Sequence, residues 1–143
     1  MDRTLTHRAR TSTWIAQIVA AGILGMTLPF KLTGAAESVA LFTTLGAEPY
    51  GRIGLGLMEL AAVILLLVPR TAVFGGLLTS GILTGAVLSH LTILGVVYRG
   101  DASLFTMAVV GLLAGSTVSW VRRREIPVVG ALFGESEEPA SVV

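Results

Sequence analysis

The sequence predicts an all-α fold: a polytopic membrane protein built as a four-transmembrane-helix bundle, with a short outer-surface helix between the first two spans. Composition is the first observation behind this prediction. Apolar residues make up 53% of the 143 residues, charged residues only 13%, and the mean hydropathy is +0.82. A soluble domain carries about twice that share of charged residues. The second observation is that four apolar segments approach the length of about 20 residues that a helix needs to cross a bilayer.

The four segments are separated by short breaks that suit tight loops. Pro69 and Arg70 divide the second segment from the third, and Gly100 and Asp101 precede the fourth. The membrane domain therefore covers residues 14–121, with expected spans at about 14–32, 50–68, 71–98 and 102–121.

The cations predict the orientation, because Lys and Arg in short loops stay on the cytoplasmic side. A basic arm, residues 1–13, precedes the first span, and a tail, residues 122–143, follows the last one. With the N-terminus inside, seven cations lie inside and three outside. The inner ones are Arg3, Arg8, Arg10, Arg70, Arg122, Arg123 and Arg124, and the outer ones are Lys31, Arg52 and Arg99. We therefore expect both termini to be cytoplasmic and the acidic end of the tail to be disordered.

An alternative interpretation takes the cationic start and the first apolar run as a signal peptide that is cleaved near Gly34. Its removal would place the Arg-rich ends on opposite sides of the membrane, so we prefer four spans. The stretch from Ala35 to Glu48 is too short to span. Its apolar residues, among them Leu41 and Phe42, predict the outer-surface helix.

Composition also excludes several classes of function. Ten Lys and Arg against nine Asp and Glu leave a net charge of +1, so we expect no nucleic-acid partner. The chain has no cysteine, which excludes thiolate zinc sites, iron–sulfur clusters and disulfide relays built from this chain alone. We expect the lipid bilayer as its environment and no metal site.

The polar residues within the spans are the candidate ligand-binding residues. A charged side chain at mid-membrane costs about 3 kcal/mol even on the lenient insertion scale, so such residues are functional by default. Glu59 lies about 13 Å below the outer end of its span, near the midplane. Lys31 and His90 come out near the outer rim, and Arg52 lies two turns above Glu59 on nearly the same face.

Two interpretations of these four residues stay open. In the functional one, Lys31, Arg52, Glu59 and His90 line an outward-facing pocket for a small amphipathic, quinone-like ligand. A ligand carbonyl would accept hydrogen bonds from Lys31 or His90. In the structural one, Glu59 is satisfied by Arg52 or Lys31, and the cations near the helix ends extend to the headgroups. Catalytic residues stay unassigned.

Small residues predict close helix packing. They form one stripe on the third span and another on the fourth, which suits either packing within the bundle or a homodimer interface. The stripes consist of Gly81, Gly85 and Ser89, and of Gly111, Gly115 and Ser119.

The same residues carry a family resemblance. The segments are Lys31-Leu-Thr-Gly34, Glu59-Leu60 before an aliphatic run that ends at Val68-Pro69-Arg70, and Gly85-Ala-Val-Leu-Ser89-His90-Leu-Thr92. Over about residues 17–120 the chain resembles DoxX-like membrane proteins. This resemblance implies a bacterial inner-membrane protein, and its relatives include a subunit of a thiosulfate:quinone oxidoreductase and assembly factors. It supports the fold more strongly than any one reaction.

The function expected from these observations is an accessory or quinone-associated subunit of a membrane redox system, which acts with a redox-enzyme partner rather than as a stand-alone catalyst. A quinone is the candidate cofactor. A non-catalytic assembly or interaction protein is the alternative. A small-solute transporter is the third hypothesis, and it is disfavoured because the inner half of the spans offers only Gln17 as a strongly polar side chain.

Overall fold

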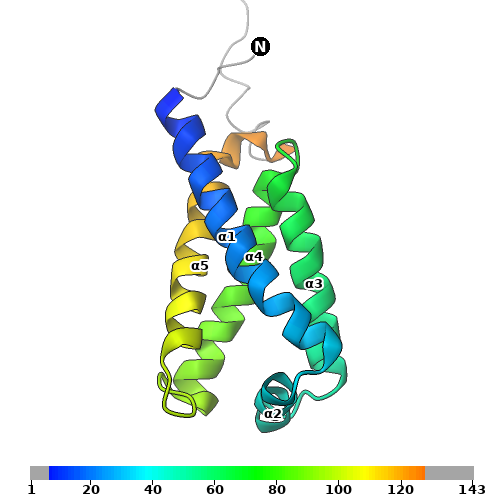
Figure 1. The fold of residues 1–143 in the computed structure, drawn as a ribbon. Coiled ribbons are helices and arrows are strands. Elements are labelled where there is room, and N and C mark those ends of the chain that lie inside the picture. Colours follow the sequence, from blue (N-terminus) through cyan, green and yellow to red (C-terminus); the bar gives the residue numbers. More distant parts are fainter. Residues whose placement is uncertain (1–6, 128–143) are drawn as a thin grey trace, which may run out of the picture.

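The computed structural model describes residues 7–127, which form a bundle of helices (Figure 1). A π-helical turn continues the third of the four long helices, and a 3-10 turn follows the last one. Within the described range there is no β-strand. The elements are α1 (His7–Thr33), α2 (Ala36–Thr44), α3 (Tyr50–Leu67), α4 (Ala72–Ser89), η1 (His90–Leu94), α5 (Ser103–Val121) and η2 (Arg123–Glu125).

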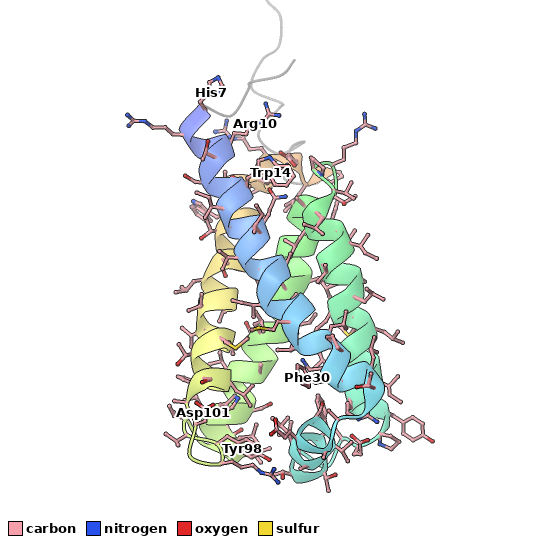
Figure 2. All side chains as sticks on the ribbon, viewed as in Figure 1. His7, Arg10, Trp14, Phe30, Tyr98 and Asp101 are labelled. Carbon is pink, nitrogen blue, oxygen red and sulfur yellow. The ribbon has the colours of Figure 1, made fainter. Side chains whose placement is uncertain are left out.

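The four long helices run alternately up and down the bundle. Helix α1 crosses it obliquely, beside α5 in its first half and beside α3 in its second half (Figure 1). Helix α2 and the α4–α5 loop lie at one end, which we call the α2 end. The start of α1, the α3–α4 loop and η2 lie at the other end, which we call the N-terminal end. Figure 2 shows His7 and Arg10 at the N-terminal end, and Tyr98 and Asp101 at the α2 end.

The distribution of side chains is the reverse of that in a soluble bundle. The buried positions hold small residues such as Ala20 and Ala62, whereas Ile18 and Leu113 on the outer faces are 60% and 64% exposed. Apolar surface of this extent is unfavourable in water and indicates contact with lipid or with another protein. Four helical segments are long and apolar enough to cross a membrane: His7–Thr33, Tyr50–Leu67, Ala72–Leu94 and Ser103–Val121. The predicted all-α four-helix membrane fold is confirmed.

Two helix ends differ from the predicted spans. Helix α1 begins at His7 rather than Trp14, and the hydroxyl groups of Thr11 and Thr13 bond to backbone carbonyls four residues earlier within this continuous helix. The third span ends at Leu94 rather than Tyr98. Gly95 follows it with a φ of 82°, a left-handed conformation that favours glycine and ends the helix despite the apolar residues beyond.

The expected outer-surface helix is present as α2, and it does more than lie on the surface. Phe42 is 5% exposed and contributes to a cavity wall, so this side chain points into the bundle. Gly46, with a φ of 70°, follows the last turn of α2. Helix α2 therefore packs against the end of the bundle and closes part of the cavity there.

Helix α4 packs closely through other residues than the predicted stripe. A Cβ atom on Gly75 would lie 2.6 Å from the backbone nitrogen of Leu66. By contrast, no atom beyond the adjoining turns of α4 itself lies within 4 Å of the Cβ position at Gly81 or Gly85. The prediction that Gly81 and Gly85 form the packing stripe of this helix within the bundle is therefore wrong. Their spacing is right for a stripe, but the rotation of the helix leaves both Cβ positions in open space, and Gly85 lines a cavity instead of a packed helix.

The stripe on the fourth span does mediate packing. A Cβ atom on Gly111 would lie 2.5 Å from Cδ1 of Leu83, and one on Gly115 would lie 2.9 Å from Cγ2 of Thr79. The Ser119 hydroxyl oxygen lies 2.7 Å from the position of a Cβ on Gly76. These contacts bring α4 and α5 together, because residues without bulky side chains let two helix backbones approach.

Two predictions fall on residues that lie outside the described range. They are the first six residues of the basic arm and the disordered acidic end of the tail, which falls within residues 128–143.

Candidate functional site

The centre of the site is the carboxylate of Glu59 on α3, which is 2% exposed. The ammonium of Lys31, in the last turn of α1, donates to its two oxygens at 2.8 and 2.9 Å. Thr27, one turn before Lys31, accepts a third hydrogen bond from the ammonium at 3.0 Å. An unpaired charge at this depth would be costly, so the ion pair makes both residues tolerable within the span.

A glycine on α3 permits this pairing. Gly56 lies one turn before Glu59, and a Cβ atom there would stand 2.9 Å from Cδ2 of Leu32 and 3.5 Å from Cβ of Lys31. The missing side chain therefore lets the end of α1 approach α3 closely enough for the Lys31 ammonium to reach the carboxylate. Nothing in the apolar pattern of α3 distinguishes Gly56 from its other glycines, so the sequence did not reveal this role.

Arg52 has a different role from the predicted one. Its Nε donates to both carboxylate oxygens of Glu48 at 2.9 Å, and its Nη1 donates to the backbone carbonyl of Lys31. The guanidinium also packs against Gly34, just beyond the end of α1. It therefore binds a backbone carbonyl that the end of a helix leaves without a helical partner. Arg52 does not line the cavity described below.

The structural interpretation agrees with the structure in one respect, because Lys31 pairs with Glu59. Its expectation that the cations near the helix ends extend to the headgroups is wrong for both. Arg52 is 8% exposed, and the Lys31 side chain is 16% exposed. Each turns inward because a carboxylate lies within reach, Glu48 for Arg52 and Glu59 for Lys31. A buried ion pair replaces the headgroup contact.

His90 lies where α4 passes into the π turn, and it is 5% exposed. Its Nδ1 lies 2.9 Å from the carbonyl oxygen of Gly95, the residue that follows the π turn. The Phe105 ring of α5 meets the imidazole edge-on, with ring centroids 5.8 Å apart at 70°. The π turn and the left-handed Gly95 therefore hold the imidazole in a fixed orientation.

Lys31, Glu59 and His90 line one cavity of about 810 Å³ at the α2 end. Its other walls are largely apolar, with Leu24, Leu83 and Ala108 deep inside and Phe42 of α2 at the end. Gly85 and Ser89 also line it, so these two members of the predicted stripe face a cavity rather than a packed helix. The sequence prediction thus placed three of its four candidate residues around a common space.

The cavity has two kinds of rim. At the side, between α1 and α5, it is lined by Met26, Phe30 and Leu104, which are 57%, 55% and 38% exposed. At the α2 end its rim includes polar residues of the α4–α5 loop, among them Asp101. The Ser103 hydroxyl and backbone N–H donate to Asp101 at 2.6 and 2.8 Å and lower the pKa of that carboxyl.

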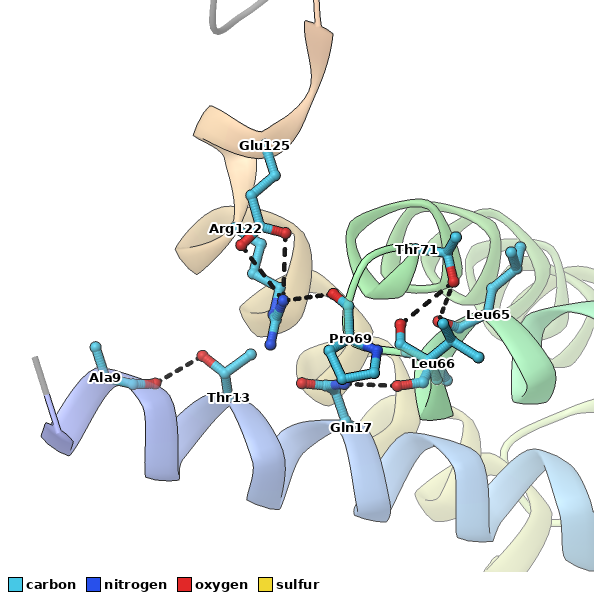
Figure 3. A network of polar contacts seen from close by, with 10 residues as sticks. Ala9, Thr13, Gln17, Leu65, Leu66, Pro69, Thr71, Arg122 and Glu125 are labelled. Atoms are coloured by element: carbon cyan, nitrogen blue, oxygen red, sulfur yellow. Dashed lines mark hydrogen bonds and ion pairs between the residues drawn. The ribbon is translucent and has the colours of Figure 1, made fainter. Parts of the chain in front are cut away.

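The N-terminal end of the bundle is held by a polar network instead (Figure 3). Gln17 of α1 donates to the carbonyl of Leu66, and Arg122 donates to the carbonyl of Pro69 at 2.7 Å. Gln17 is fully buried and Arg122 is 7% exposed. Arg122 stands first in a run of three arginines that resembles a solvated helix stop, so its burial could not be recognised from the sequence. These bonds tie α1 to the last turn of α3, and the end of α5 to the α3–α4 loop.

Within residues 7–127 no group of three His, Asp or Glu side chains could hold a metal ion. Comparison with known proteins finds no matching family model, no matching curated protein and no matching solved structure.

Proposed function

We propose that this chain is a DoxX-like protein of the bacterial inner membrane that binds a small amphipathic, quinone-like ligand in the cavity at the α2 end. In this proposal it serves as an accessory subunit of a membrane redox system and acts with a redox-enzyme partner. The resemblance of the Lys31, Glu59 and His90 segments to that family supports the family and the compartment. The cavity supports the ligand.

The observation that carries the proposal is the Lys31–Glu59 pair in the wall of an apolar cavity of about 810 Å³. A packed core would enclose such a pair on all sides, because interiors leave few voids larger than a water molecule. Here polar atoms and apolar walls share one space. That combination suits a ligand with a polar head and an apolar body.

The side rim supports a ligand that is dissolved in the bilayer. Met26, Phe30 and Leu104 belong to helices that can span the membrane, so their exposed side chains face hydrocarbon. A ligand that enters the cavity between α1 and α5 passes these three apolar side chains. Quinones and similar amphiphiles partition into this phase, whereas small ions do not.

The charges support an orientation in which the cavity opens toward the cell exterior. Of the three cations at the α2 end, Lys31 and Arg52 are held in internal ion pairs, and Arg99 is exposed. The N-terminal end carries Arg8 and Arg10 of α1, Arg70 of the α3–α4 loop and the three arginines that follow α5. The positive-inside rule then favours cytoplasmic termini.

Mass spectrometry of the natively purified protein tests the ligand. We expect wild-type protein to retain a quinone or a related amphiphile and Glu59→Leu to lose it. Glu48→Gln is the matched control, because it breaks an ion pair of the same kind outside the cavity and should retain the ligand. If Glu59→Leu folds poorly, Lys31→Met/Glu59→Leu removes both charges together. Equal ligand content in wild-type and charge-free protein would contradict the proposal.

One observation favours the docking alternative. Gly81 is exposed and has open space at its Cβ position, so α4 presents a shallow face to the membrane on which another helix could pack. Under this alternative, Gly81→Leu abolishes co-purification of a membrane partner or a second copy while ligand content stays unchanged. The opposite pattern, with loss of ligand in the Glu59 variant and intact assembly in Gly81→Leu, favours the cavity.

A transporter fits the geometry less well. At the N-terminal end, Gln17 and Arg122 are engaged with backbone carbonyls across the bundle, so a solute would have to break this network to pass.

A further inference from the structure

The hydrogen-bonding capacity of the cavity decides which head group it can take. An ammonium carries three N–H donors and no acceptor. In Lys31 they are directed at the two oxygens of Glu59 and at the hydroxyl of Thr27, at 2.8, 2.9 and 3.0 Å. The ammonium therefore has no donor left for a ligand. This differs from the expectation that Lys31 donates to a ligand carbonyl.

His90 offers a ligand a hydrogen-bond acceptor. A backbone carbonyl can only accept, so the 2.9 Å contact to Gly95 means that Nδ1 carries the proton and donates it. In the neutral imidazole the other nitrogen, Nε2, then holds a lone pair. Among residues 7–127 no side chain or backbone group donates to Nε2. The π turn and Gly95 thus select the tautomer whose lone pair is left for a ligand.

Glu59 adds further acceptor capacity. An ionised carboxylate has about four lone-pair positions. The Lys31 ammonium takes two of them, and the Thr27 hydroxyl reaches a third only at 3.5 Å. Both buried polar groups with spare capacity in the wall are therefore acceptors. Side chains with unused donors, Ser38, Tyr98 and Arg99, also line the cavity, but they are more exposed and belong to α2 and to the α4–α5 loop.

We propose that the cavity selects a head group that donates hydrogen bonds, the hydroxyl of a phenol or hydroquinone, over a carbonyl or ether of the same size. The inference rests on the proposed function and names its ligand class. A hydroxyl satisfies the lone pairs of His90 or Glu59. A carbonyl places its own lone pairs against them and leaves both sides unsatisfied, which a buried site penalises strongly.

Two matched pairs of probes test this inference on the full chain in lipid nanodiscs. The first pair is 4-nonylphenol and 4-nonylanisole, which differ in the donor alone. The second is decylubiquinol and decylubiquinone under anaerobic conditions. We expect the hydroxyl form to bind about tenfold more tightly in each pair, the value of one hydrogen bond to a buried acceptor.

A conservative variant assigns the effect to His90. In His90→Asn the side-chain amide nitrogen can still donate to the Gly95 carbonyl, while the Nε2 acceptor is lost. We expect the preference to fall to about threefold or less, with little change in the unfolding midpoint. Thr92→Ala is the matched control, because Thr92 lies in the same π turn, is exposed and does not line the cavity. It should keep the full preference.

The outcomes separate the two proposals. Binding of all four probes with no preference, or with a preference for the carbonyl and ether forms, overturns this inference and leaves the proposed function in place. Binding of none of them overturns the proposed function and this inference together. Should His90→Asn fold poorly, competition between the phenol and the anisole on the wild-type protein decides the question alone.

Discussion

The buried Lys31–Glu59 pair should be strongly coupled, and a double-mutant cycle measures this coupling. Lys31→Met leaves the Glu59 carboxylate, 2% exposed, with only the Thr27 hydroxyl at 3.5 Å. Removal of one partner of a buried pair costs about 3–5 kcal/mol. We therefore expect Lys31→Met to lower the free energy of unfolding by about 3 kcal/mol.

The double variant Lys31→Met/Glu59→Leu removes both charges and leaves an apolar surface. Buried pairs replaced in this way are often neutral in stability, so the double variant should lie within about 1 kcal/mol of wild type. Equilibrium unfolding in mixed micelles with increasing dodecyl sulfate, followed by the fluorescence of Trp14 and Trp120, provides the free energies. The cycle should show non-additivity of several kcal/mol.

A weak polar contact provides the control cycle. The hydroxyl oxygens of Ser80 and Ser116 lie 3.5 Å apart, and the contact is exposed. Their Ala variants should be additive within about 0.5 kcal/mol. If the Lys31 and Glu59 variants were equally additive, the two groups would not depend on each other, and the reasoning about the pair would be refuted.

Three further predictions follow from the same geometry. Gly75→Ala should lower the free energy of unfolding by about 1–3 kcal/mol, because its Cβ would meet the Leu66 backbone, whereas Gly81→Ala should be neutral or slightly stabilising in the same titration. Arg52→Lys should lower the free energy of unfolding by about 1–3 kcal/mol, because a lysine ammonium lacks the planar guanidinium that donates to Glu48 and to the Lys31 carbonyl together. The ligand content of this variant should stay at the wild-type level. The lowered pKa of Asp101 means that its carboxylate contributes to the free energy of unfolding at pH values above the usual pKa of 3.8, and that this contribution is lost as the pH falls through the lower pKa of the folded protein. When the free energy of unfolding is measured against pH, wild type and Asp101→Asn should therefore differ above this pH window and agree below it.

The membrane fold was predictable because lipid leaves a chain few choices. Backbone polar groups in hydrocarbon must be satisfied within the helix, so apolar length alone located the spans. It could not locate the end of the third one. His90–Leu94 form a π turn, and Gly95 turns the chain away although Val96 and Val97 continue the apolar run. That end depends on backbone geometry, which hydropathy does not encode.

The candidate site was predictable in its members and not in its pairing. Depth along each helix brought Lys31, Glu59 and His90 to one end of the bundle. The choice of Lys31 over Arg52 as the partner of Glu59 depends on two local features, the missing side chain at Gly56 and the capture of Arg52 by Glu48. Both depend on the rotation of each helix about its axis, which no single-helix pattern specifies.

Helix rotation also explains why the packing stripe predicted for the third span, which included Gly81 and Gly85, is wrong. Gly75 and Gly81 are both small residues on α4, and only contact with α3 and α5 decides which of them is covered. The hydrophobic pattern of this helix does not distinguish its faces, because lipid and the bundle interior are both apolar.

Photoaffinity mapping tests most directly whether a ligand occupies the cavity. A diazirine-bearing alkylphenol is activated in nanodiscs that contain the full chain, and the labelled peptides are sequenced by mass spectrometry. We predict labels on cavity-lining residues of three helices, Thr27 in α1, Ser89 in α4 and Met107 in α5, with loss of these labels when unlabelled nonylphenol competes. Labels confined to lipid-facing positions such as Leu113, and insensitive to the competitor, would contradict a binding site at the Lys31–Glu59 pair.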